Sequence, residues 1–192
     1  MLKTTANNLF RRLEQLNGIG AALSRERDIE RLLENILEAA KALTGADGGT
    51  LYRVTDDQAA LRFEIMRTDS LGIRQGGTTG QRIHLPELPL RRADGSPNDA
   101  LVAAYAAIHD RTVNIADAYA EEGFDFSGTR AFDQRTGYRS QSFLTVPMKN
   151  HDGELIGVLQ LLNALDPDTG EVVPFSEADQ SLTESLASQA AI

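Results

Sequence analysis

The sequence contains no cysteine and only three histidines. The absence of cysteine excludes disulfide bonds, thiolate metal sites and catalysis by a thiol nucleophile, and it is compatible with a reducing compartment. His84, His109 and His151 lack the i, i+4 spacing that places two imidazoles on one face of a helix. The sequence therefore predicts no metal site.

Long apolar runs and an excess of basic residues are also missing. No apolar segment approaches the roughly 20 residues that a membrane-spanning helix requires, and the N-terminus lacks the apolar core of a signal peptide. The 192 residues carry a formal net charge of −9, whereas nucleic-acid surfaces gather lysine and arginine. We therefore predict a cytoplasmic chain that binds neither membranes nor nucleic acids.

The sequence lacks the motifs of common enzyme classes. There is no G-x-S-x-G nucleophile elbow, and the glycine-rich segment Gly76–Gly80 lacks the Gly-Lys-Ser/Thr end of a phosphate-binding loop. Carboxylates are numerous, but no pair is singled out as catalytic. We predict that the chain is not an enzyme and that it carries no covalent cofactor.

Apolar residues recur at helical spacing over residues 9–43, with a charged interruption at residues 24–28. Two successive helices are therefore predicted, the second with Asp28 as its N-cap and Gly45 as its C-cap. The narrow leucine stripe of the first helix suits pairing with another helix or packing on its own domain. We assign residues 1–27 to a signalling and dimerisation helix and residues 28–192 to a separate domain.

Two hairpins are predicted from alternating apolar residues around turns. The first joins residues 50–54 to residues 61–66, and the second joins residues 142–149 to residues 154–162 across an Asn-His-Asp-Gly turn. The segment between the hairpins predicts shorter elements: a strand near Ile83, a helix over residues 98–108 and a strand over residues 111–115.

A last helix is predicted to open at a capping box formed by Ser176 and Asp179. Its pattern continues to the final residue, so we expect the chain to be part of a longer signalling protein. The fold class is α+β: a central antiparallel sheet of about six strands, with the N- and C-terminal helices on one face and a pocket covered by loops and helices on the other.

One polar residue interrupts the most apolar predicted strand. Gln160 points to one face of the sheet, whereas Leu159 and Leu161 point to the other. A buried amide costs free energy unless a neighbouring group or a ligand matches its donors and acceptor. Residues 132–140 must cross the open face of the sheet just before the second hairpin, so they can line a cavity above Gln160.

The stretch TGYRSQSFLTVPMKNHDGELIGVLQLLN, with RTVNIADAYAEEGFDF before it, resembles the GAF domains of cyclic-nucleotide phosphodiesterases and bacterial adenylyl cyclases. The resemblance covers residues 28–192 and is strongest over residues 111–163. It implies a regulatory sensor domain that binds a small molecule on one face of the sheet. It also implies terminal helices that form a homodimer and carry signals to a separate output domain.

The resemblance also implies which residues contact the ligand. A segment written D-x-x-T-x-x-x-T/S in the cyclic-nucleotide-binding members falls on Asp133, Thr136 and Ser140, a polar strand residue falls on Gln160, and a hydroxyl falls on Thr50. These residue types suit cyclic AMP or cyclic GMP without fixing the base. The alternative is that the first three residues only cap a helix and form turns.

A second family signature, written NKFDE, is degenerate in this chain. Asn163, Phe175 and Asp179 match it, but Ala164 stands where the family has lysine and Gln180 where it has glutamate. The signature's lysine and aspartate are thought to pair, which Ala164 cannot do. The difference weakens the cyclic-nucleotide hypothesis without ending it.

Two alternatives to a cyclic nucleotide stay open. The domain can serve as a dimerisation and signal-relay module without a ligand, or it can bind another small metabolite such as haem. Attached bilin and the chemistry of GAF-type methionine sulfoxide reductases both require cysteine, so the resemblance does not extend to those members.

Overall fold

The computed structural model describes residues 2–190, which form an antiparallel sheet with helices on both faces. Residue 1, which begins the predicted helix region 1–27, and residues 191–192, which end the predicted domain 28–192, lie outside the described residues. The main path of the sheet runs β3-β2-β1-β7-β6-β5, and the short strands β4 and β8 pair with β2 and β7. The strand bounds are β1 Ala46–Val54, β2 Ala60–Thr68, β3 Ile73–Gly76, β4 Leu88–Pro89, β5 Val113–Ile115, β6 Phe143–Lys149, β7 Leu155–Leu165 and β8 Val172–Val173.

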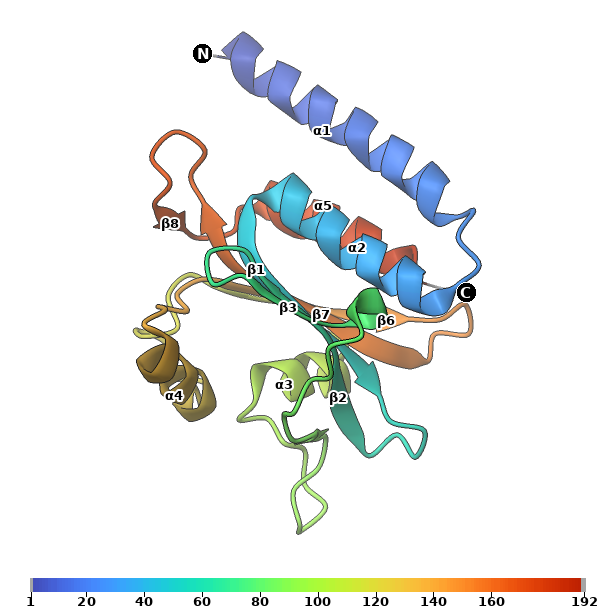
Figure 1. The fold of residues 1–192 in the computed structure, drawn as a ribbon, viewed down its shortest axis with the longest axis vertical. Coiled ribbons are helices and arrows are strands. Elements are labelled where there is room, and N and C mark those ends of the chain that lie inside the picture. The colour runs from blue at the N-terminus through green and yellow to red at the C-terminus, as the bar shows by residue number, and fades with distance from the viewer. Residues whose placement is uncertain (1, 191–192) are drawn as a thin grey trace.

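The helices divide between the two faces of the sheet (Figure 1). Helices α2 and α5 lie on one face with α1 outside them, and α3 and α4 lie on the other face. This arrangement confirms the predicted α+β class, with both terminal helical regions on the same side. The helix bounds are α1 Leu2–Leu23, α2 Ile29–Thr44, α3 Val102–His109, α4 Ser127–Thr136 and α5 Glu177–Ser188, with a short 3₁₀ turn, η1, at Gly77–Thr79.

The ends of α2 and α5 are set by local hydrogen bonds, as predicted. The Asp28 side chain accepts from the backbone N–H groups of the first turn of α2, and Gly45 ends that helix in the left-handed region at φ 70°. Ser176 and Asp179 form the capping box of α5, each accepting from the other's backbone N–H. The Asp28 and Ser176 caps satisfy N–H donors at the helix starts, and the Gly45 N–H donates to the Lys41 carbonyl at the end of α2.

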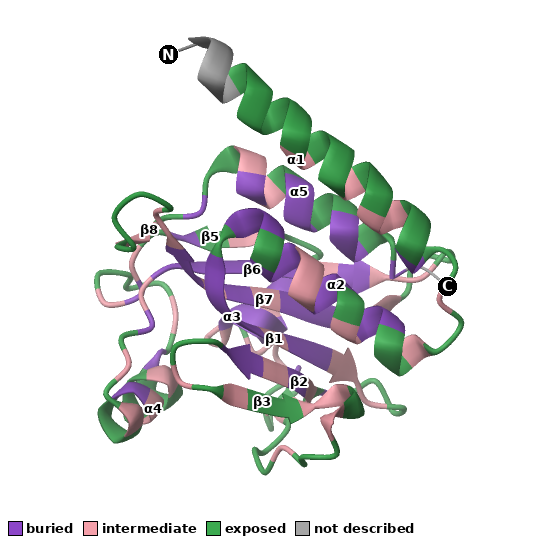
Figure 2. Cartoon of the chain, turned by 45° about the horizontal axis from the view of Figure 1, so that its top comes forward, coloured by how far each residue is buried: buried purple, intermediate pink, exposed green. Residues whose placement is uncertain are grey.

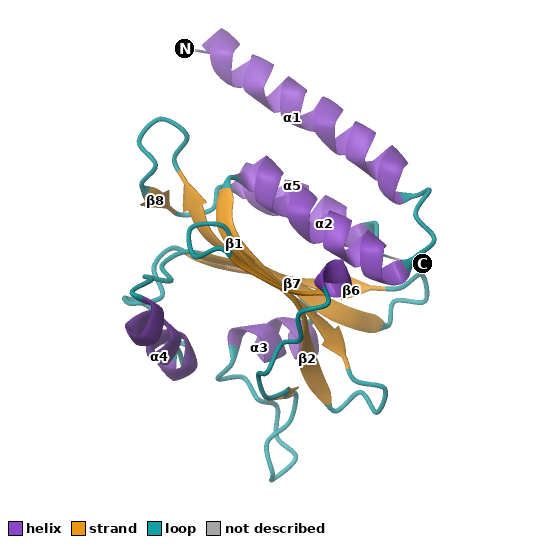
Figure 3. Ribbon diagram, in the orientation of Figure 1, coloured by secondary structure: helices purple, strands orange, loops and turns teal. Residues whose placement is uncertain are grey.

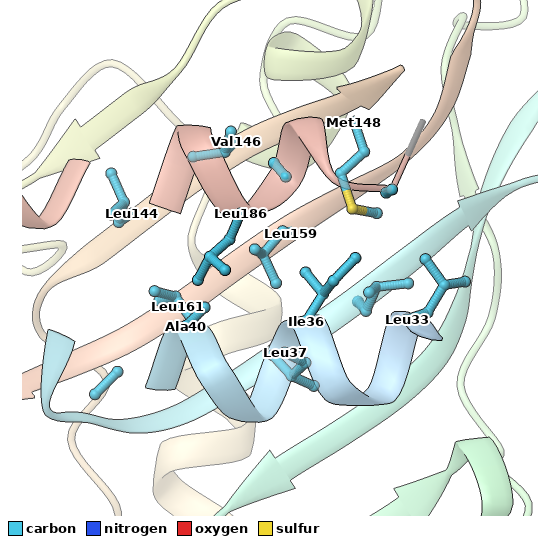
Figure 4. Packing of buried hydrophobic residues seen from close by; sticks show 14 of the residues in the cluster. Leu33, Ile36, Leu37, Ala40, Leu144, Val146, Met148, Leu159, Leu161 and Leu186 are labelled. Carbon is cyan, nitrogen blue, oxygen red and sulfur yellow. The ribbon is translucent and has the colours of Figure 1, made fainter. Parts of the chain in front are cut away.

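The main apolar core lies between the sheet and the α2/α5 pair (Figure 4). Leu37 of α2 reaches the sheet directly at Gly49, where an added Cβ would lie 2.6 Å from the Leu37 Cδ1 atom. Leu159 and Leu161 of β7 point into this core and are fully buried, as the alternation predicted. The core residues labelled in Figure 4 are Leu33, Ile36, Leu37, Ala40, Leu144, Val146, Met148, Leu159, Leu161 and Leu186.

Helix α1 lies along the outside of the α2/α5 layer and is mostly exposed (Figure 2). Leu16 and Ile19 pack against the core, whereas Leu9, Phe10 and Leu13 are 48%, 64% and 45% exposed. The predicted leucine stripe is therefore split between the chain's own core and solvent. Across residues 2–190, none of the helices combines the length and the hydropathy needed to cross a bilayer.

The prediction of a strand near Ile83 is wrong. Residues 80–87 form no strand, and the chain pairs with β2 before and after them, through β3 and β4. A single apolar residue between Arg82 and His84 gives no alternation to bury, and Pro86 removes a backbone donor. Strand β3 was missed because its sequence, IRQG, carries one apolar residue at an exposed edge.

Candidate functional site

Three polar side chains form a row across the centre of the sheet. Thr50 of β1 and Thr145 of β6 are the two partners that flank Gln160 of β7 in the strand pairing. Partners in adjacent antiparallel strands point to the same face. The next residues of β7 on that face, Val158 and Leu162, pack in two different apolar clusters. The polar row therefore lies between these clusters, and both clusters contain residues of α3. Figure 3 shows α3 and α4 on this side of the sheet.

Two atoms of this polar row are buried without a partner. Across the described residues, three buried side-chain nitrogen or oxygen atoms make no hydrogen bond, and two of them are Thr145 Oγ1 and Gln160 Oε1. Thr145 is 0% exposed. Leaving such a group unpaired costs about 1–3 kcal/mol, so the row is a place where a hydrogen-bonding ligand would recover free energy.

The row contains two of the predicted site residues and one that was missed. Thr50 and Gln160 are brought together directly, as neighbours in the β1–β7 pairing. Thr145 was not predicted, although a lone hydroxyl in the apolar stretch FLTVPM is a detectable feature. Its position opposite Gln160 places it in the same site.

Asp133 and Ser140 are also together, but they are bonded to each other. The buried Asp133 carboxylate accepts from the Ser140 backbone N–H at 2.9 Å and from the Ser140 hydroxyl at 2.7 Å. It also accepts from the Tyr119 hydroxyl at 2.5 Å, and this bond raises the pKa of Tyr119. The carboxylate is thus engaged with its own chain, as a turn residue would be.

Thr136 lies at the end of α4 and is bonded locally. Its hydroxyl donates to the Phe132 carbonyl at 2.8 Å and accepts from the Tyr138 backbone N–H at 3.3 Å. The Tyr138 hydroxyl in turn donates to Asp47 at 2.7 Å, which ties this end of α4 to β1. Burial, together with the Asp47 carboxylate, raises the pKa of Tyr138, so the phenol remains a donor.

We call residues 126–140, which include α4, the lid. Helix α4 itself contributes one buried residue, Asp133, and is otherwise exposed or half-buried (Figure 2). Before the helix, Phe126 packs on Phe143 of β6 with ring centroids 5.5 Å apart. The lid is therefore anchored by an aromatic contact at its start and by polar contacts at its end.

Asn163 joins the end of the lid and the residues that follow it to β7. Its Oδ1 accepts from the backbone N–H groups of Gln141 at 2.8 Å and Ser142 at 3.2 Å, and its Nδ2 donates to the Arg139 carbonyl at 2.8 Å. Asn163 is 2% exposed and adopts φ 54°, a left-handed conformation that asparagine tolerates. Its role in this structure is to hold the backbone at the end of the lid and just after it.

The other two residues of the degenerate signature lie on the α2/α5 side. Phe175 is buried in the main core. Asp179 caps α5 and pairs with Arg12 of α1. Ala164, at the position where the family has lysine, is buried on β7 and faces Ala46 and Val173.

Two surface cavities lie elsewhere on the molecule. One, of about 290 Å³, lies between the start of α2 and the turns of the two hairpins; the other, of about 340 Å³, lies beside β6 near Lys149 and Glu184. Neither is lined by the predicted site residues. Within the described part of the chain, no three metal-ligating side chains gather in one place.

A model of the GAF domain family matches residues 28–192 of the chain. The dual 3′,5′-cyclic-AMP and -GMP phosphodiesterase 11A of Takifugu rubripes is 39% identical over 83 residues, which are 43% of this chain and 8% of the relative. The dual 3′,5′-cyclic-AMP and -GMP phosphodiesterase 11 of Drosophila melanogaster is 28% identical over 163 residues, which are 83% of this chain and 10% of the relative. The chain spans at most a tenth of these curated relatives.

Solved structures share the fold at low sequence identity. The GAF domain of a phosphoenolpyruvate-protein phosphotransferase from Coxiella burnetii superposes with a TM-score of 0.68 and 18% identity, covering 95% of this chain and 92% of that one. The free methionine-R-sulfoxide reductase of Neisseria meningitidis gives 0.62 and 20%, covering 93% and 85%. These similarities concern the architecture alone.

Proposed function

Since the chain belongs to the GAF domain family, we propose that it is a regulatory domain that senses a small molecule, and that this molecule is cyclic AMP or cyclic GMP. The similarity to two dual cyclic-nucleotide phosphodiesterases supports the choice of ligand. The ligand binds on the sheet face covered by α3 and the lid. Catalysis is assigned to no residue of this chain and belongs to a separate output domain.

The observation that carries this proposal is the polar row, in which Thr145 Oγ1 and Gln160 Oε1 are buried without a partner among the described residues. Gln160 Oε1 can accept only, whereas the hydroxyls of Thr145 and Thr50 can donate and accept. A purine base offers N–H donors and ring-nitrogen acceptors along one edge, and a ribose offers a hydroxyl. The row is neutral, so it suits the base or the ribose of a nucleotide rather than its phosphate.

Asp133, Thr136 and Ser140 act indirectly in this proposal. Their hydrogen bonds hold the end of the lid in place. Binding beneath the lid would be felt at these bonds and at Asn163, which holds the residues that follow. The three predicted ligand contacts thus become residues that set the lid's position.

The test compares nucleotide binding by the unmodified chain and by Thr145→Val. At about 100 times its Kd, a ligand that binds only the folded state stabilises it by about 2.7 kcal/mol. We expect cyclic AMP or cyclic GMP, but not the non-cyclic monophosphates, to raise Tm in a thermal-shift assay and to bind in calorimetry.

Thr145→Val removes an unpaired hydroxyl and keeps the side-chain shape. It should raise the Tm of the unliganded chain by about 2–5 °C and reduce the nucleotide-dependent shift. Thr183→Val is the matched control: Thr183 is equally buried, but it lies in α5 and its hydroxyl donates to the Asp179 carbonyl at 2.8 Å. An unchanged nucleotide affinity in Thr145→Val would remove the row from the site.

The second candidate is a dimerising signal relay without a ligand. The exposed stripe of Leu9, Phe10 and Leu13 on α1 favours it, because such a stripe suits a second copy of the helix. In either case we propose residues 1–27 as the signalling helix and residues 28–192 as the sensor domain. A chain that responds to none of the nucleotides would support the relay.

A further inference from the structure

Arg12 is a charged residue through which α1 contacts the rest of the chain. Its Nη2 atom donates to the Leu43 carbonyl at 2.8 Å and pairs with the Asp179 carboxylate. The Arg12 side chain is 27% exposed and that of Asp179 is 11% exposed, so the contact is partly shielded from water. Four residues further along α1, Leu16 packs against the core and continues the same face of the helix.

Two negative features meet where Arg12 binds. Leu43 lies in the last turn of α2, where backbone carbonyls have no partner within the helix and the helix dipole is negative. Asp179 lies in the first turn of α5, where its second carboxylate oxygen accepts from the Ser176 backbone N–H at 2.9 Å. A guanidinium matches both features, because it donates several hydrogen bonds and always carries its charge.

The same aspartate belongs to the degenerate signature. Position 164 cannot supply a cation, because Ala164 is a small residue buried on β7. The cation beside Asp179 is Arg12 of α1, 167 residues away in sequence.

The backbone that leads into α5 is tied to the residues that follow the lid. The Ser142 hydroxyl donates to the Val173 carbonyl at 2.8 Å and accepts from the Ala164 backbone N–H at 3.2 Å. Asn163 holds Ser142 in the same region, through the hydrogen bond described above. Val173 precedes α5 in the chain, so these bonds tie the segment before α5 to Ser142, which follows the lid.

We propose that Arg12 is a latch that docks α1 on the junction of α2 and α5. The latch makes the placement of α1 depend on the start of α5. Because one nitrogen of Arg12 makes both contacts, and Nε is buried without a partner among the described residues, the latch is weaker than a fully bonded guanidinium. It works whether or not a nucleotide binds.

Amide hydrogen exchange of the whole chain tests the latch, with Arg12→Gln compared to Arg11→Gln. Arg11 is the neighbouring, exposed arginine of the same helix, so the control makes the same change in charge. We expect α1 amides to exchange about tenfold faster in Arg12→Gln, as for loss of one partly shielded charged contact. The sheet and α2 should keep their exchange rates, and Arg11→Gln should leave α1 unchanged.

A double-variant cycle with Asp179→Asn separates a pair from two independent effects. If Arg12 acts through Asp179, the double variant should exchange in α1 no faster than the faster single variant. Arg12→Lys should restore part of the protection, because lysine keeps the charge but not the fork of donors. Unchanged exchange in Arg12→Gln, additive effects in the cycle, or faster exchange throughout the sheet would each overturn the latch.

Discussion

The two faces of the sheet treat buried polar groups differently. On the α2/α5 face, Arg67 is 0% exposed and every nitrogen of its guanidinium donates: to Glu34, to Glu38, and to the backbone carbonyls of Met66 and Gln75. On the opposite face, Thr145 is buried as deeply and its hydroxyl has no partner within the described residues. A charged residue is fully matched on one face, whereas neutral residues are left unmatched on the other.

This difference indicates on which face the chain supplies hydrogen-bond partners for its own buried polar groups. Folded proteins pair almost all buried polar groups, and the exceptions concentrate at functional sites. Among the described residues, two of the three unpaired buried atoms, Thr145 Oγ1 and Gln160 Oε1, lie on the adjacent strands β6 and β7 at the centre of the sheet. The third, Arg12 Nε, lies in α1, outside the sheet. The α2/α5 face is a structural core, and the α3/α4 face is where we place the ligand.

The largest effect should come from shortening neighbouring leucines of β7 that point to opposite faces. Leu161 is fully buried in the main core, whereas Leu162 is half-buried beside the polar row. Leu161→Ala should lower the free energy of unfolding by about 3 kcal/mol, and Leu162→Ala by about 1 kcal/mol. Urea denaturation of both variants measures the difference, and equal losses would show that the two faces are packed alike.

A smaller effect is expected at Glu34, which pairs with Arg67 on the core face. Burial favours a higher pKa, but hydrogen bonds from Thr78 and the Arg67 guanidinium hold the pKa of Glu34 below its ordinary value. A pKa lowered by folding contributes stability that is present above the unfolded pKa, about 4.3 for glutamate. That contribution is lost as the pH falls through the folded value.

Glu34→Gln should therefore lower the free energy of unfolding by about 2 kcal/mol at pH 7 and by less at pH 3, because pH 3 lies below the unfolded pKa, where this contribution declines. Urea denaturation at both pH values measures this. The exposed Glu87→Gln makes the same change in charge without a buried partner. A loss in Glu34→Gln that did not diminish on acidification would show that the ion pair is not its cause.

Much of the fold could be predicted because its decisive patterns are local. The helical spacing up to Leu43, the caps at Asp28 and Ser176, and the alternation around Gln160 all act within a few residues. The edge strand β3 could not be predicted, because its pairing with β2 is maintained by backbone hydrogen bonds and not by a buried side-chain pattern.

The site was harder to predict, because it depends on register between strands. The β6–β7 pairing contains an irregularity between Met148 and Lys149. It shifts the β7 partners of residues 143–148 by one residue from those of a regular ladder. Counting outward from the Lys149–Leu155 pair without it would place Thr145 opposite Leu159 rather than Gln160. Likewise, the spacing of Asp133 and Ser140 could not reveal whether they bind a ligand or each other.

The smallest effect should appear at the end of the lid, in Tyr138→Phe. The change removes the hydrogen bond to Asp47, which keeps its two bonds from Ser70, so the free energy of unfolding should fall by about 1 kcal/mol or less. Because the lid contributes little apolar burial, its amides should exchange faster, whereas those of α2 should not. Tyr105→Phe on α3, the same substitution on the same side of the sheet, is the control.

If the lid's exchange in Tyr138→Phe stays at the unmodified rate, the lid is held by Asp133 and Asn163 rather than by β1. The two faces would then differ only in the unpaired atoms of the polar row, and not in how firmly the lid is held. If α2 exchanges faster as well, Asp47 transmits the loss to the core side, and the two faces are not independent. Faster exchange confined to the lid, residues 126–140, would show that the lid can move while the α2/α5 face stays folded. A sensor requires such independence, because its ligand must change the lid without unfolding the core.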